Sequence, residues 1–108
     1  MPLSIHVQDA NGEPVRESGR IVQLFQDDGV NLERMLRECQ NNDSFHFLPF
    51  IDFYDDTVFN RLQMTPFLAE WRRIRPTNDQ ERGILVKVER LADMVATEVH
   101  LDLKFLGD

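Results

Sequence analysis

Hydrophobic and polar residues alternate at both ends of the chain. Near the start, Leu3, Ile5 and Val7 are separated by single polar residues. Near the end, the same alternation runs from Val99 to Phe105. A period of two buries one face of a strand and exposes the other. Because the two segments match in character, we expect them to pair in one small sheet.

A turn signal follows the first expected strand. Asn11-Gly12 is a dipeptide that favours tight turns, so a short return through Pro14 can form a hairpin. Pro14 lacks a backbone N–H group, which restricts this return to an edge of the sheet.

Between the two ends, hydrophobic residues recur every three or four positions, which predicts amphipathic helices. The clearest stripe is Leu32, Met35, Leu36 and Cys39. The expected helices are Arg20–Asp27 with Ser18 as N-cap, one capped by Asn31, one from Thr65-Pro66 to Pro76, and one starting near Thr77 with Gln80 as capping-box partner.

These elements predict one α+β domain over residues 1–108. It would hold a small mixed or antiparallel sheet, built from the N- and C-terminal strands and packed against about four helices. A chain of 108 residues with 42% hydrophobic residues can bury a single core.

The net charge of −7 argues against a nucleic-acid backbone or an anionic membrane as partner. The charge is unevenly distributed: residues 1–56 carry eleven acids and four arginines, while residues 57–108 carry eight acids and eight bases. An acidic half of this kind either keeps the protein in solution or attracts a basic protein partner.

The single cysteine, Cys39, excludes an internal disulfide, and its place on a hydrophobic stripe predicts a core residue. No export signal and no long hydrophobic stretch are evident, so the cytoplasm is the expected location. Phosphate-binding loops, dinucleotide fingerprints and nucleophile elbows are also lacking. We therefore expect no cofactor and no enzymatic activity.

The central stretch FIDFYDDTVFN, residues 50–60, places three aspartates among aromatic residues. Its spacing does not fit a calcium-binding loop, because Tyr54 and Thr57 occupy positions that need a ligand and a glycine. We expect Asp55 or Asp56 to cap a helix that points Val58, Phe59 and Leu62 inward, and Asp52 to close a turn through its own backbone. An exposed partner-binding patch and a catalytic or metal centre are the alternatives.

Eight of the ten aromatic residues lie within 27 positions, between Phe45 and Trp71. They cannot all be buried in so small a domain, so we expect some to lie exposed beside the aspartates. The predicted partner-binding residues are Asp52, Tyr54, Asp55 and Asp56.

The segment IDFYDDTVFNRLQM at residues 51–64, with the ending HLDLKFLGD, resembles a family of small bacterial proteins of unassigned function. The central segment of that family reads Ile-Asp-Pro-Tyr-Gly-Asp-Thr-Val-Phe-Asn, followed by a Gln-Met pair. This chain departs from it at Phe53 and Asp55. The resemblance implies a bacterial protein and no particular activity.

Three histidines, His6, His46 and His100, each stand between hydrophobic neighbours. If all three lay in strands of one sheet, their imidazoles could converge on a zinc ion, with Asp102 orienting one ring. A metal-dependent enzyme that uses these histidines, and Asp52 as a further candidate, is therefore one alternative function.

The expected function is a small, non-enzymatic bacterial interaction protein that binds a basic protein partner, as immunity proteins and antitoxins do. Exposed aromatics would anchor the partner and carboxylates would accelerate encounter. A self-associating structural protein is the remaining alternative, so a homo-oligomer is possible.

Overall fold

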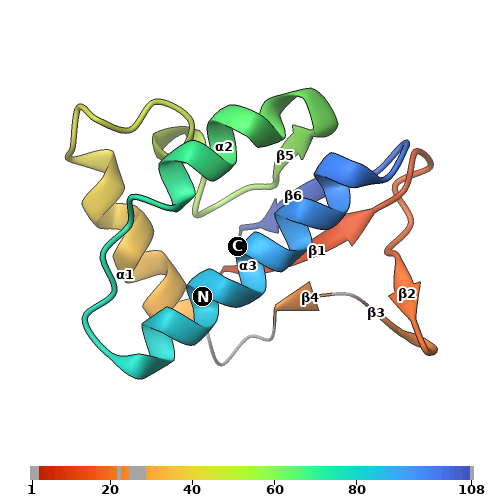
Figure 1. The fold of residues 1–108 in the computed structure, drawn as a ribbon, viewed down its shortest axis with the longest axis horizontal. Helices are drawn as coiled ribbons and strands as arrows, with labels where there is room; N and C mark the ends of the chain where they lie inside the picture. Colours follow the sequence, from red (N-terminus) through yellow and green to blue (C-terminus); the bar gives the residue numbers. More distant parts are fainter. Residues whose placement is uncertain (1–2, 22, 25–28, 108) are drawn as a thin grey trace.

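The computed structural model describes residues 3–21, 23–24 and 29–107. It shows an α+β fold, as expected, in which helices pack against a four-stranded antiparallel sheet (Figure 1). The elements are β1 (Ser4–Gln8), β2 (Arg16–Glu17), β3 (Arg20–Ile21), β4 (Gln23–Leu24), α1 (Gly29–Gln40), η2 (Leu48–Phe50), β5 (Thr57–Asn60), η3 (Arg61–Gln63), α2 (Met64–Trp71), α3 (Asp79–Thr97) and β6 (Asp102–Leu106), where η denotes a 3₁₀ helix.

The predicted pairing of the two chain ends is confirmed. The strand order is β4-β1-β6-β5, and β1 pairs antiparallel with β6 in a register that sets Ile5 opposite Phe105. Both strands alternate between fully buried and half-buried positions. The helices cover the buried side, and α3 contacts β1, β4 and β6 (Figure 1). The half-buried side of the sheet is open to solvent.

The turn after β1 is also confirmed. Gly12 has a positive φ of 79° and donates its N–H to the carbonyl of Asp9. The chain then returns beside β1, where Pro14 forms an isolated bridge with Gln8 and the Val15 N–H bonds Val7. The return is thus limited to an edge contact.

The predicted helix over residues 20–27 is wrong. Ser18 and Gly19, with φ of 51° and 79°, form a tight turn between β2 and β3 and do not cap a helix. Two consecutive residues with positive φ suit a two-residue hairpin, so the chain leaves the turn as a strand. β4 then pairs with β1. Residues 22 and 25–27 of the predicted helix lie outside the described part of the chain.

The three described α-helices bury their predicted stripes but start and end at other residues. All four residues of the α1 stripe are buried, although α1 begins at Gly29, before the predicted cap Asn31. α2 follows directly on η3, and it ends at Trp71 well before Pro76. The expected Thr65 cap is replaced by a reciprocal pair, in which Asn60 and Gln63 each accept the other's backbone N–H.

The cap of α3 lies one residue beyond its predicted position. Asn78, and not Thr77, caps the helix by accepting the Glu81 N–H at 2.8 Å. The residue three places after the cap is therefore Glu81 and not Gln80, and Glu81 is buried. The predicted inner face of α3 is otherwise confirmed, with Leu85 only half-buried.

Aromatic rings from three elements form the centre of the core. Phe67 stacks on Trp71 with ring centroids 5.6 Å apart, and Phe59 meets Phe105 edge-on at 5.8 Å. The indole N–H of Trp71 donates to the carbonyl of Leu85, which satisfies its buried polar atom. This cluster fixes β5 against α2 and β6, and so positions the segment that precedes β5.

No helix among the described residues is long and apolar enough to cross a membrane.

Candidate functional site

The segment of residues 49–56, here called the acidic–aromatic loop, brings the predicted partner-binding residues together. Phe50 and Tyr54 are 78% and 77% exposed, and all three aspartates of the loop are exposed. Ile51 and Phe53 alternate with them and are buried. The loop therefore presents two aromatic side chains and three carboxylates to solvent, while the buried Ile51 and Phe53 anchor its backbone to the core.

Short hydrogen bonds hold the loop in one shape. Asp52 accepts the Tyr54 N–H at 2.8 Å, which confirms the predicted turn, and its own N–H donates to the Thr57 hydroxyl at 2.9 Å. The Asp55 carboxylate accepts the Asp56 N–H at 2.8 Å. A loop that is already ordered loses less conformational entropy on binding than a flexible one.

Gly107 ties the loop to the end of β6. Its N–H donates to the Asp55 carbonyl at 3.1 Å. A Cβ atom at position 107 would collide with that carbonyl oxygen, far inside van der Waals contact. The loop and the C-terminal strand therefore meet at a point where only glycine fits.

The predicted helix after the aspartates is wrong, because residues 57–60 form strand β5. This segment is a strand because it pairs with β6, where Phe59 lies opposite Leu103. Phe59 is buried, as predicted. Val58 and Leu62 were expected to point inward but are 45% and 82% exposed. The strand turns Val58 to the open side of the sheet, and Leu62 lies in the following 3₁₀ turn.

Two cations lie beside the loop, and one of them pairs with a carboxylate of the loop. The Arg37 guanidinium lies over the Phe53 ring, 4.4 Å from its centroid, and lines a shallow hollow of about 400 Å³ beside Phe50 and Tyr54. Lys104 lies 3.4 Å from Asp56. Among the residues that the structure describes, the ion pairs place a cation at Asp56 but at neither Asp52 nor Asp55.

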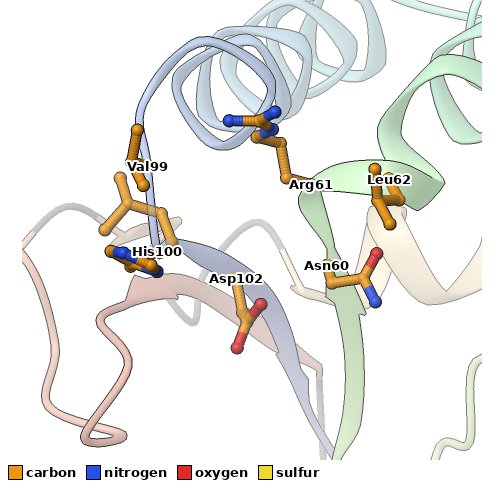
Figure 2. Close-up of a pocket in the computed structure, with 7 residues that line it drawn as sticks. Asn60, Arg61, Leu62, Val99, His100 and Asp102 are labelled. Atoms are coloured by element: carbon orange, nitrogen blue, oxygen red, sulfur yellow. The ribbon is translucent and has the colours of Figure 1, made fainter.

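A second hollow, of about 390 Å³, lies where β5 ends and β6 begins (Figure 2). Asn60 and Asp102 are opposite each other in the sheet, and Arg61 and Leu62 close one side. Val99, 63% exposed, and His100 line the other side. The hollow is wide, and its exposed hydrophobic residues suit a contact surface better than an enclosed reaction site.

The expectation that all three histidines stand in strands is wrong for two of them. His46 lies in the irregular segment before η2, and His100 lies in the turn before β6 with φ of 65°. The positive φ interrupts the alternation, so His100 does not share a strand face with Asp102. Within residues 3–21, 23–24 and 29–107, no group of three or more His, Cys, Asp or Glu side chains could hold a metal ion.

His6 lies on the open side of the sheet, yet its Nε2 atom is buried and has no hydrogen-bond partner among the described residues. Burial and the neighbouring Lys104 charge lower the pKa of His6, while Asp56 and Gln8 oppose this shift. The lowered pKa favours the neutral form of this side chain.

Two buried carboxylates were missed by the sequence analysis. Glu70 accepts the backbone N–H groups of His46, Phe47 and Leu48 at 2.8–3.1 Å. Glu81 accepts two guanidinium N–H groups of Arg34, together with the N–H and hydroxyl of Thr77. The signal for Glu81 was its place three residues after Asn78, whereas nothing local indicates the role of Glu70.

Cys39 is buried, as predicted, and burial raises its pKa to about 11. A thiol with so high a pKa is a poor nucleophile at neutral pH.

No family model, curated protein or solved structure matches the chain. The resemblance of residues 51–64 to a small bacterial family stays a prediction, and function has to be argued from the geometry of the loop.

Proposed function

We propose that the protein is a non-enzymatic interaction module of bacterial type that binds a basic protein through the acidic–aromatic loop. One observation carries the proposal: Phe50 and Tyr54 project from the same loop as the exposed carboxylates of Asp52 and Asp55. Aromatic side chains supply much of the binding energy at protein interfaces, and opposite charges speed encounter.

The way the loop is held supports this proposal. Large aromatic side chains are costly to expose, and the neighbouring Phe53 shows that the same segment can bury one. Phe50 and Tyr54 instead remain in solvent while the backbone beneath them is fixed by hydrogen bonds to Thr57 and Gly107. A rigid backbone with exposed anchors is suited to binding a partner without rearrangement.

The charge of the chain defines the chemistry of the partner. Its net charge of −7 repels nucleic acids and anionic membranes and attracts a basic protein surface. Neutralisation of a cationic toxin in the cytoplasm, in the manner of an immunity protein or an antitoxin, is the concrete form that we propose.

The first test locates the interface. A photo-crosslinking amino acid is placed at Tyr54 and, as a matched control, at Val86, which is 68% exposed on α3. In cells, the Tyr54 position should crosslink a basic protein that the Val86 position does not. The same products from both positions would contradict the proposal.

The second test uses the crosslinked partner and removes charge without removing the loop's hydrogen bonds. Asn can replace Asp52 and Asp55 because its side-chain oxygen still accepts a backbone N–H. The double Asp→Asn variant should lower the association rate about 3- to 10-fold at low salt and reduce its dependence on ionic strength. An equal loss in a variant neutralised at the exposed Asp43 and Asp93 would assign the effect to net charge alone.

A further inference from the structure

We propose that the hollow beside Phe50 and Tyr54 receives one arginine side chain of the basic partner, whose guanidinium stacks on an aromatic ring and donates to Asp52. This inference rests on the proposed function and deepens it, because it names the residue type that the partner must place there.

The hollow has buried residues at its base and exposed residues around its rim. Ile51 and Phe53 are buried, whereas Phe50, Asp52 and Tyr54 are exposed, and all five line the hollow. Because exposed and buried residues alternate along this segment, the carboxylate stands between the two exposed rings in the sequence and on the same side. A volume of about 400 Å³ is at the lower end of pockets that take a small ligand, which suits one long side chain.

The charges around the hollow favour a cation as its occupant. Among the described residues that line it, Arg37 carries a positive charge and Asp52 a negative one. Arg37 donates two N–H groups to the carboxylate of Glu33, so its charge is already balanced within α1. The ion pairs among the described residues place no cation at Asp52. One negative charge therefore remains for the partner to pair with.

Asp52 is positioned as a hydrogen-bond acceptor. Its Oδ1 atom accepts the Tyr54 N–H at 2.8 Å, and its backbone N–H donates to the Thr57 hydroxyl at 2.9 Å. The hydrogen bonds of the described residues engage Oδ1 and leave Oδ2 open to a donor from outside. An ionised carboxylate accepts such a bond more strongly than a neutral oxygen does.

Arginine fits these groups better than lysine does. A planar guanidinium can stack on a ring and donate to a carboxylate at the same time, whereas the lysine ammonium is compact and more strongly hydrated. The protein already uses such stacking in this hollow, since the Arg37 guanidinium lies over the Phe53 ring at 4.4 Å from its centroid. Phe50 and Tyr54 supply two further rings at the rim.

NMR titration of the ¹⁵N-labelled chain with a Gly-Arg-Gly peptide, acetylated and amidated at its ends, tests the inference. The amide signals of residues 50–54 should shift, with a dissociation constant in the millimolar range that suits a single side chain. The matched citrulline peptide keeps the shape of arginine without its charge and should bind about 5-fold more weakly or less. A lysine peptide should bind about 3-fold more weakly than the arginine peptide.

Three variants locate the bound arginine. Asp52→Asn keeps an oxygen for the Tyr54 N–H but loses the charge, so it should weaken arginine-peptide binding about 5-fold or more. Phe50→Leu replaces the ring with a hydrophobic chain and should weaken it about 2- to 5-fold. Asp93→Asn, the same charge change at an exposed site on α3, should alter it by less than about 1.5-fold.

A Gly-Glu-Gly peptide with the same blocked ends tests the opposite occupant, an acidic side chain at Arg37. Its binding should be weaker than that of the arginine peptide. A glutamate peptide that binds as tightly as the arginine peptide would overturn the inference. An equal loss in Asp93→Asn and Asp52→Asn would also overturn it, because net charge would then explain the binding.

The peptide titration and the crosslinking experiment can fail separately. If Tyr54 crosslinks a basic protein but the arginine peptide binds no tighter than the citrulline peptide, the arginine site is refuted and the proposed function stands. If the arginine peptide binds as expected but no basic protein is crosslinked, the arginine site is supported and the proposed function fails.

Discussion

Carboxylates of two kinds accept backbone N–H groups in this protein, and their surroundings differ. Glu70 and Glu81 are buried between segments that are distant in the sequence, whereas Asp52 and Asp55 are exposed and bond only neighbouring residues. The buried pair connects elements, because Glu81 links α3 to Arg34 of α1. The exposed pair shapes one loop and leaves its charge in solvent. The comparison separates acids that stabilise the fold from acids available to a partner.

Replacing Glu81 should have the largest effect on stability. Gln at this position turns an amide NH₂ toward a donor, either Arg34 or Thr77, and removes the charge that Arg34 pairs with. Breaking a buried ion pair is strongly destabilising, and the half-exposed Arg34 can recover some hydration. We expect Glu81→Gln to lower the free energy of unfolding by about 2–4 kcal/mol, measured by urea denaturation.

Glu81 should also make the free energy of unfolding depend on pH in the acid range. Burial raises the pKa of Glu81, but the hydrogen bonds from Arg34 and Thr77 outweigh it, so the pKa lies below its usual 4.5. The charged form therefore stabilises the fold above about pH 4.5, and this contribution is lost as pH falls through the lower pKa of the folded state. Glu81→Gln should flatten the acid limb of the stability curve. An unchanged limb would show that other carboxylates control it.

Glu70→Gln should have a smaller effect. The two carboxylate oxygens of Glu70 accept the N–H groups of His46, Phe47 and Leu48. In the Gln variant, the side-chain NH₂ group would face at least one of these N–H groups, so two donors would meet without an acceptor. None of the ion pairs given by the described residues involves Glu70, so we expect a loss of about 1–3 kcal/mol by the same denaturation. Hydrogen exchange should rise at residues 46–48 first. Exchange that rises equally throughout the chain would contradict a local role.

The sequence pattern correctly predicted those parts of the fold that follow from local periodicity. The β1–β6 pair and the buried stripe of α1 each follow from one repeated period. β5 and β4 could not be predicted in this way, because each is a short segment whose conformation depends on a distant strand: β6 for Phe59 and β1 for Leu24. Strand preference is a property of such partners more than of the segment itself.

The candidate site was predicted in composition but not in arrangement. The stretch around Asp52 indicated that some aromatics would lie exposed, and the turn at Asp52 followed from its side chain. Which aromatics are exposed depends on tertiary contacts, since Phe53 is covered by Arg37 of α1 while Tyr54 is not buried. Glu70 was missed for the same reason: the N–H groups that it accepts lie more than twenty residues away.

The smallest effect should come from the exposed acids. Asp55→Asn keeps an oxygen for the Asp56 N–H, and Asp52→Asn keeps one for the Tyr54 N–H, so neither exposed site leaves a buried group unpaired. We expect each change to alter the free energy of unfolding by less than about 0.5 kcal/mol in urea denaturation. The same pair of changes is the one expected to slow association with a basic partner. If either cost as much stability as Glu70→Gln, these aspartates would belong with the carboxylates that hold the fold, and the distinction between the two kinds would fail.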